Sequence, residues 1–161
     1  GQIAAGLAIS VVGFYCSYLL WIPIAVSLSL GLLLVLRIVG MVLSLGGAVL
    51  FLWARRTLGA MYNASTSSAV QLQTNHRLIQ YGPYALVRHP IYLSYWIMLV
   101  GLLAVYRTWM LLFALIMMLI SLSKRARREE QVLEATFGDK WREYAREVPR
   151  FTPHWRQIHY G

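Results

Sequence analysis

The sequence predicts an all-α fold: a polytopic bundle of four or five membrane helices with a cytoplasmic loop and amphipathic helices at the C-terminal end. Three observations predict it. Of the 161 residues, 58 % are hydrophobic, and the mean hydropathy of +0.55 is rare in a soluble domain. Long stretches carry no charged side chain. The charged residues gather in two segments instead. We therefore treat residues 1–161 as one membrane domain.

The N-terminal third is almost free of charge, with uncharged runs over 1–36 and 38–54. A first helix is expected over about 3–20, followed by an interfacial turn at Trp21 and Pro23, because Trp favours the headgroup level. Cys16 lies alone in this apolar run, so it predicts neither a disulfide nor a metal site.

Residues 24–54 allow two interpretations. They form either one long tilted helix in which Arg37 snorkels, or two short crossings broken near Arg37. Four crossings would place the N-terminus and the tail together in the cytoplasm, whereas five would place the N-terminus outside. Residues 24–36 alone are short for a crossing, which favours four. Small residues recur here at a spacing typical of close helix packing, at Gly40, Ser44 and Gly47.

A helical hairpin is predicted over residues 91–123, where Arg107 is the only charged side chain. At about 1.5 Å per residue, each half makes a helix of roughly 22–25 Å, nearly a membrane crossing. A turn at 106–108 would carry the chain out and back. His89 and Glu129, far apart in sequence, are therefore expected to lie on the same face of the membrane.

The loop between the second and third hydrophobic regions, residues 55–90, is rich in Asn, Ser, Thr and Gln, and such loops often carry ligand contacts. Pro83 and Pro90 stiffen its end, and Pro90 suits the first turn of the helix that follows.

The tail continues as a helix from Lys124 to about Phe137. Gly138 interrupts this helix, and Asp139 is expected to cap a second short helix that Pro149 ends. Apolar residues recur through the tail in steps of three and four, which indicates an amphipathic stripe that docks onto the membrane or the loop: Leu133, Phe137, Trp141, Tyr144 and Val148.

Charge fixes the expected topology. Four of the 15 Lys and Arg residues lie in 55–90 and nine follow residue 123, while all six acidic residues lie between 129 and 147. The positive-inside rule places loop 55–90 and the tail in the cytoplasm. Attraction to anionic headgroups accounts for this charge better than binding of nucleic acid. The four His residues lack Cys or acidic neighbours at ligand spacing, so no metal site is expected.

A polar site is predicted where the hairpin leaves the bilayer. Arg125 and Glu129 are four residues apart, hence on one helix face, although a routine surface ion pair would show the same spacing. His89 and Tyr92 have an equally ordinary interpretation as interfacial residues. Their joint placement across the hairpin favours a functional site.

The polar residues of the loop and tail resemble the isoprenylcysteine carboxyl methyltransferase family, and phospholipid N-methyltransferases share the pattern. The resemblance covers about residues 40–153 and implies an integral membrane methyltransferase that uses S-adenosylmethionine. It rests on these stretches: His76-Arg77-Leu78-Ile79, Gly82-Pro83-Tyr84, Arg88-His89-Pro90-Ile91-Tyr92, Arg125, Glu129-Glu130, Phe137-Gly138, Trp141, Tyr144 and Val148-Pro149-Arg150.

The resemblance also implies roles for individual residues. Arg125 would face the methyl acceptor, and Glu130 is the expected base if that acceptor is an amine. A glutamine that contacts the cofactor in the eukaryotic enzymes would align near Ala69, where Gln71 or Gln73 is the candidate substitute. The residues implied to contact the cofactor are His76, Arg77, Leu78, Ile79, Tyr84, His89, Pro90, Ile91, Tyr92 and Glu129.

The acceptor is expected to be lipophilic and to enter from the bilayer. A prenylated cysteine carboxylate is the first candidate, with an aminophospholipid and a small thiol as alternatives. Two predictions of other classes stay open at this point. An NADPH-dependent sterol-reductase-like protein shares the Arg-His-Pro stretch but carries Arg-Asp where this chain has Glu129-Glu130. A non-enzymatic membrane scaffold would use the polar loop to bind a partner.

Overall fold

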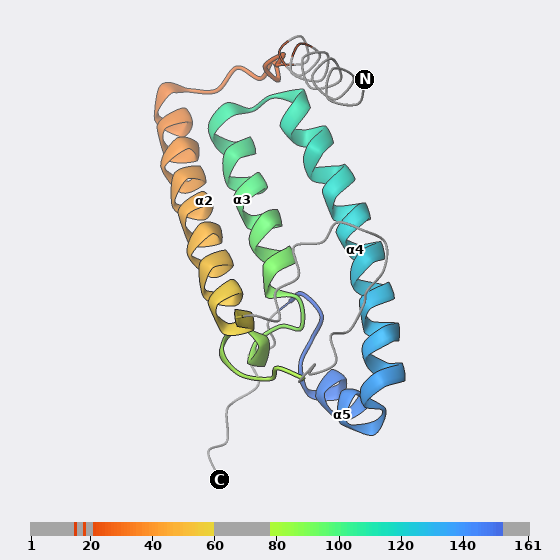
Figure 1. Ribbon diagram of the computed structural model, residues 1–161. Coiled ribbons are helices and arrows are strands. Elements are labelled where there is room, and N and C mark those ends of the chain that lie inside the picture. The colour runs from red at the N-terminus through yellow and green to blue at the C-terminus, as the bar shows by residue number, and fades with distance from the viewer. Residues whose placement is uncertain (1–14, 16–17, 19–20, 60–77, 153–161) are drawn as a thin grey trace, which may run out of the picture.

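Three long helices stand side by side in the computed structural model, which describes residues 15, 18, 21–59 and 78–152 (Figure 1). They are α2 (Leu30–Leu58), α3 (Pro90–Tyr106) and α4 (Trp109–Phe137), with α3 in the middle. The short helix α5 (Asp139–Glu147) and the 3-10 helix η2 (Gly82–Ala85) lie together at one end of the bundle. The regular secondary structure of the described residues is helical apart from one isolated β-bridge, so the all-α prediction is confirmed.

Helix α2 is one continuous helix through Arg37, so the interpretation as two short crossings is wrong. It begins later than predicted, because residues 24–29 are extended and the Ser29 side chain accepts a hydrogen bond from the backbone N–H of Leu32, at 3.4 Å. It also runs past residue 54 to Leu58, where Gly59 is the C-cap, with a φ of 55° that few other residues adopt. The polar loop therefore starts about four residues later than predicted. The helix expected over 3–20 lies almost wholly outside the described residues.

Trp21 and Pro23 lie in a non-helical connecting segment, and the backbone N–H of Trp21 donates to the carbonyl of Tyr18 at 3.1 Å. The predicted interruption of the helices is therefore present, and it continues as an extended segment beyond Pro23. This segment crosses the tip of the hairpin: Pro23 forms a bridge with Thr108, and the backbone N–H of Ile24 donates to the carbonyl of Arg107 at 2.7 Å. The backbone groups of the turn are thereby satisfied by the neighbouring chain.

The hairpin itself is confirmed. Helix α3 ends at Tyr106, Arg107 adopts the left-handed conformation (φ 49°, ψ 52°), and Thr108 is the N-cap of α4. The Thr108 side chain accepts from the backbone N–H of Leu111 at 3.4 Å. One left-handed residue and one cap thus reverse the chain within two residues.

Small residues bring α2 and α3 into close contact. The Ser44 hydroxyl donates to the carbonyl of Gly40 at 2.9 Å, and a Cβ on Gly101 would lie 2.5 Å from that same carbonyl oxygen. A Cβ on Gly47 would meet the side chain of Met98 at 2.6 Å. The packing predicted for positions 40, 44 and 47 is therefore present, with Gly101 as the residue opposite.

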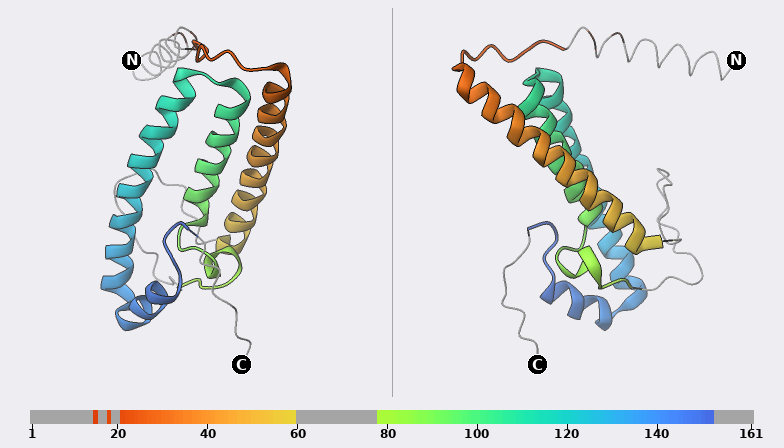
Figure 2. Two further views of the ribbon diagram at one scale, coloured as in Figure 1. Left: turned by 180° about the vertical axis from the view of Figure 1, so that it is seen from behind. Right: turned by 90° about the vertical axis from the view of Figure 1, so that its left-hand side faces the viewer.

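Two of the described helices, α2 and α4, are long and apolar enough to cross a membrane, and α3 is apolar but shorter. Their outward side chains are largely exposed, which suits contact with lipid. The end of α2, η2, the start of α3 and α5 gather at one end of the bundle in both further views (Figure 2). The total number of crossings and the cytoplasmic side stay predictions.

The tail folds back on the loop. Trp141, Tyr144 and Val148 form a buried cluster against which Leu78 and Phe137 pack, so the apolar stripe docks onto the loop as predicted. Asp139 does not cap α5. Gly138, at φ 54°, occupies the cap position, and the Asp139 carboxylate instead accepts from Arg142 at 2.8 Å.

Candidate functional site

The site lies where the end of the loop, the tail, the first turn of α3 and the C-terminal half of α4 meet. Pro83 lies in the first turn of η2, and the buried Tyr84 is held there because the Tyr144 hydroxyl of α5 donates to its carbonyl at 2.7 Å. Burial raises the pKa of Tyr144 above its usual range, so the hydroxyl keeps its proton and remains a donor.

The tail pairs with the end of the loop through the backbone. The N–H of Arg88 donates to the carbonyl of Pro149 at 2.9 Å, and the N–H of His89 donates to the carbonyl of Arg150 at 3.2 Å. The Arg88 guanidinium also donates to the carbonyl of Val148 at 3.0 Å. Pro149 ends α5 and leaves these carbonyls available. The start of α3 is therefore fixed by residues some sixty positions later in the chain.

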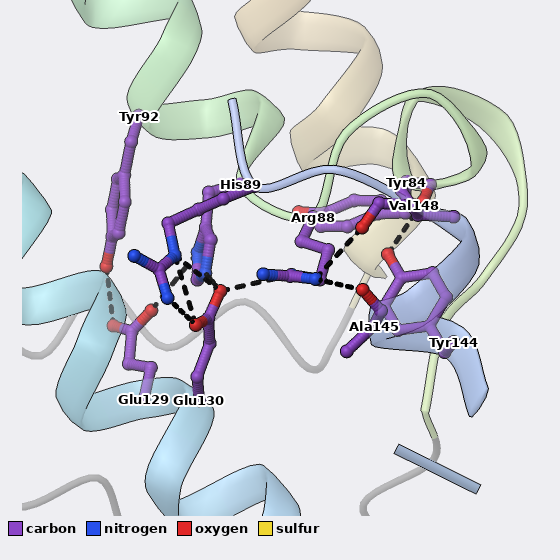
Figure 3. Close-up of polar contacts among 10 residues, drawn as sticks. Tyr84, Arg88, His89, Tyr92, Glu129, Glu130, Tyr144, Ala145 and Val148 are labelled. Atoms are coloured by element: carbon purple, nitrogen blue, oxygen red, sulfur yellow. Dashed lines mark hydrogen bonds and ion pairs between the residues drawn. The ribbon is translucent and has the colours of Figure 1, made fainter. Parts of the chain in front are cut away.

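Glu129 joins the two arms of the hairpin (Figure 3). The Tyr92 hydroxyl of α3 donates to Glu129 Oε1 at 2.5 Å, and Arg125 Nε donates to the same oxygen at 3.0 Å. Nδ1 of His89 lies 3.7 Å from Glu129 Oε2. The Glu129 side chain keeps 21 % of its surface exposed, so its second oxygen can still accept a hydrogen bond from a ligand.

Glu130 lies among two arginines and a histidine. Arg88 Nε and His89 Nε2 lie 3.1 Å and 3.2 Å from its Oε1, and Arg150 Nε lies 2.9 Å from that oxygen while a second Arg150 nitrogen reaches Oε2. Its side chain is only 11 % exposed. Burial by itself raises the pKa of Glu130, but hydrogen bonds from His89 and Arg150 and the charge of Arg88 lower it to about 2. Glu130 is therefore a fixed anion at neutral pH.

His89 lies between the two carboxylates. Its ring stacks on that of Tyr92, with centroids 5.3 Å apart and planes at 3°, and the Phe151 ring lies 5.7 Å away on the tail. Only 8 % of His89 is exposed. Because its two nitrogens face different carboxylates, its orientation is set from both sides.

The structure brings together five of the residues predicted for the site: Arg125, Glu129, Glu130, His89 and Tyr92. Others lie next to this group. Pro90 is the buried first residue of α3 and Ile91 follows it, half-buried. Ile79 is half-buried in the loop. Tyr84 and Leu78 face α5 instead, in the contacts described above. His76, Arg77, Ala69, Gln71 and Gln73 lie outside the described residues.

Two basic side chains of the site had been assigned no role. Arg88 and Arg150 both bind Glu130, and Arg88 also lies 5.8 Å above the ring of Trp141. The sequence contained a signal for this pairing: the chain has few acidic residues, and a carboxylate that is buried requires cationic or hydrogen-bonding partners, which the basic residues nearby can supply. Trp96 and Phe151, whose rings lie 4.3 Å apart, were also missed.

The chain is similar to known membrane methyltransferases in sequence and in fold. A family model described as phospholipid methyltransferase matches residues 35–140. Among solved structures, the chain is similar to the eukaryotic intramembrane Ras methyltransferase ICMT (isoprenylcysteine carboxyl methyltransferase). The TM-score is 0.65 at 23 % sequence identity, over 73 % of this chain and 42 % of that chain. The chain thus spans less than half the length of that protein, and at this identity the similarity concerns the fold. A search of curated proteins finds no match.

Proposed function

The chain belongs to the phospholipid methyltransferase family, and we propose that it transfers a methyl group to the polar head of a lipophilic acceptor. Enzymes of this family use S-adenosylmethionine as the methyl donor. One observation carries the proposal. The hairpin joins Tyr92 to Glu129, at 2.5 Å, and so assembles the motif residues of loop and tail into one polar site.

The side chains in this site suit S-adenosylmethionine, which carries ribose hydroxyls, an adenine ring and a sulfonium cation. The partly exposed carboxylate of Glu129 can accept from hydroxyls or face a cation, and it is already oriented by Tyr92 and Arg125. The parallel rings of His89 and Tyr92 offer flat aromatic surface. We propose these three, His89, Tyr92 and Glu129, as the centre of the cofactor site. The remaining implied contacts extend it along the loop: His76, Arg77, Leu78, Ile79, Tyr84, Pro90 and Ile91.

S-adenosylmethionine supplies an electrophilic methyl group, whose bond to sulfur breaks as the bond to the acceptor forms and a neutral thioether is left. Such a displacement depends on alignment and on exclusion of water more than on acid–base groups. In this proposal the side chains of the site align the acceptor with the methyl donor. Arg125 orients the acceptor in this proposal, and the stacked pair of His89 and Tyr92 is held by carboxylates on α4.

Glu130 suits a positioning role better than the role of base. A carboxylate whose pKa is about 2 accepts a proton weakly at neutral pH, and its oxygens already bind Arg88, His89 and Arg150. An amine acceptor must lose a proton, whereas a carboxylate acceptor reacts as the anion it already is. We therefore favour a lipid carboxylate, such as a prenylated cysteine, over an aminophospholipid or a small thiol. Family membership likewise favours a methyltransferase over the reductase and scaffold alternatives.

The test is calorimetric binding of S-adenosylhomocysteine to the detergent-purified protein and to Glu129→Gln. Loss of a hydrogen bond to a charged acceptor is expected to weaken binding by about ten- to a hundredfold. Glu134→Gln is the matched control, because Glu134 lies on the same helix in an exposed pair with Arg142. Equal affinity of Glu129→Gln and the wild type would overturn the site. No binding by the folded wild type would overturn the function.

The acceptor class is tested with labelled methyl donor and three probes: N-acetyl-S-farnesylcysteine, phosphatidylethanolamine and a small alkyl thiol. Label in the farnesylcysteine ester supports the carboxylate acceptor. Label in either of the other two overturns that choice and selects the corresponding alternative.

A further inference from the structure

Trp96 lies on the same face of α3 as the aromatic residues of the site. It follows Tyr92 by four positions, a spacing that places the two side chains on one face of α3, and the His89 ring stacks on Tyr92 at the start of that helix. Trp96 is therefore one turn further along α3 than Tyr92, toward the middle of the bundle. The ring of Phe151, which also lies beside His89, packs against it with centroids 4.3 Å apart.

The indole nitrogen of Trp96 is buried and has no hydrogen-bond partner in the part of the chain that the structure describes. An indole N–H only donates, and a buried donor without an acceptor costs about 1–3 kcal/mol. Packing alone does not account for tryptophan here, since a phenylalanine would fill much of the same space without the unpaired donor. The unpaired donor among these site residues therefore points to a ligand that carries an acceptor.

The register of the hairpin places Arg125 at the same level. Helices α3 and α4 run in opposite directions (Figure 1), and Tyr92 on one meets Glu129 on the other. One turn beyond Tyr92 is Trp96, and one turn before Glu129 is Arg125. The Arg125 side chain, which binds Glu129 through Nε, remains 41 % exposed. A cation on α4 and a neutral donor on α3 thus lie at one level, on the membrane side of the proposed cofactor site.

We propose that Trp96 Nε1 donates a hydrogen bond to an anionic oxygen, carboxylate or phosphate, in the head of the lipophilic acceptor, and that Arg125 provides the charge for the same anion. The inference rests on the proposed function and names the acceptor side of that site. A hydrogen bond to an ionised acceptor is roughly twice as strong as one between neutral groups, and burial strengthens it further. A neutral donor achieves this at apolar depth without the desolvation of a second charged side chain.

The direct test is NMR of the full chain in detergent with ¹⁵N-labelled tryptophan. Trp96→Phe identifies the Trp96 indole resonance by its loss. Trp96→Phe keeps an aromatic ring and removes a donor that is unpaired without ligand, so we expect it to fold. If Trp96→Phe does not fold, Trp96→His identifies the Trp96 indole resonance in the same way. N-acetyl-S-farnesylcysteine, dodecyl phosphate and uncharged farnesol are then added separately. We expect one or both anions, and not farnesol, to move the Trp96 indole proton downfield.

The two anions separate the sources of the acceptor oxygen. A response to the carboxylate alone supports a prenylcysteine-type head, a response to the phosphate alone supports a phospholipid head, and a response to both supports an anion site without that preference. No response to either, or an equal response to farnesol, overturns the inference.

Kinetics supply a second readout. With the acceptor that accepts label, Trp96→Phe is expected to lower kcat/KM for the acceptor about tenfold while the affinity for S-adenosylhomocysteine stays at the wild-type value. Trp109→Phe is the matched control, since Trp109 is 54 % exposed at the far end of the hairpin. Unchanged kcat/KM in Trp96→Phe overturns this inference alone. Absence of cofactor binding in the wild type instead overturns the proposed function, so the two failures are distinguishable.

Discussion

Replacing Glu130 with glutamine removes the one carboxylate that Arg88, His89 and Arg150 share while keeping its size. The expected effect can be worked from its pKa, which the surrounding donors lower from 4.5 to about 2. A group with a lower pKa in the folded state stabilises folding above its unfolded pKa. For Glu130 this contribution is about 3 kcal/mol at pH 7, and the side chain is only 11 % exposed, so solvent screens it little.

The same numbers give the pH dependence. The contribution of Glu130 is fully present above pH 4.5 and is lost as the pH falls toward 2. Between pH 7 and pH 3 the wild type should lose about 2 kcal/mol that Glu130→Gln cannot lose, because the amide does not titrate. Glu130→Gln should therefore be about 3 kcal/mol less stable than the wild type at pH 7 and closer to it at pH 3.

The assay is chemical unfolding in detergent, followed by near-UV circular dichroism at both pH values. Glu134→Gln is the control for loss of a carboxylate on α4, because Glu134 keeps 52 % of its side chain exposed and is expected to change stability by less than about 1 kcal/mol. If Glu130→Gln unfolds like this control at pH 7, or keeps the full acid-induced loss of the wild type, the assignment of Glu130 as the anchor of the tail is refuted.

Two further substitutions test the packing that supports the site. Gly101→Ala should destabilise the bundle by about 1–3 kcal/mol, because its Cβ would clash with the Ser44 hydroxyl oxygen. Gly46→Ala is the control, since a Cβ there meets nothing within 4 Å. Equal unfolding midpoints of the two variants would contradict the close contact of α2 and α3. Tyr144→Phe should lower the unfolding free energy by about 1–3 kcal/mol, since it leaves the carbonyl of Tyr84 without its 2.7 Å donor, and unchanged stability would show that this bond does not hold α5 to the loop.

The hairpin could be predicted because its signals are local. A single charge at Arg107 in an apolar stretch marks the turn, and antiparallel helices return the chain to the level from which it started after a similar number of residues on each side of the turn. From that symmetry alone His89 and Glu129 come together, and the structure places them 3.7 Å apart. The start of α2 was predicted less well, because residues 24–29 are as apolar as the helix that follows. The start of α2 is set instead by the Ser29 cap and by the hydrogen bond between Ile24 and the hairpin turn.

The partners of Glu130 could not be predicted in the same way. Arg88 lies 42 positions before it and Arg150 lies 20 positions after it, so neither spacing places the two on one helix face. The position of Arg150 depends on the direction in which α5 leaves α4, at Gly138 with its positive φ. Trp96 was hidden for another reason, since a tryptophan in an apolar helix reads as a lipid-facing side chain until its nitrogen is seen to be buried.

The two adjacent carboxylates owe their different roles to helix geometry. Consecutive residues on a helix point about 100° apart, so Glu129 faces Tyr92 on α3 while Glu130 faces Arg150 on the tail. His89 contacts both, with one ring nitrogen toward each. Docking of the tail at Glu130 therefore orients the ring that stacks on Tyr92, beside the carboxylate proposed for the cofactor. On this argument the docking of the C-terminal segment and the affinity for S-adenosylhomocysteine are linked through the His89 side chain. Glu130→Gln should therefore weaken the binding of S-adenosylhomocysteine, although Glu130 does not contact the ligand in this proposal.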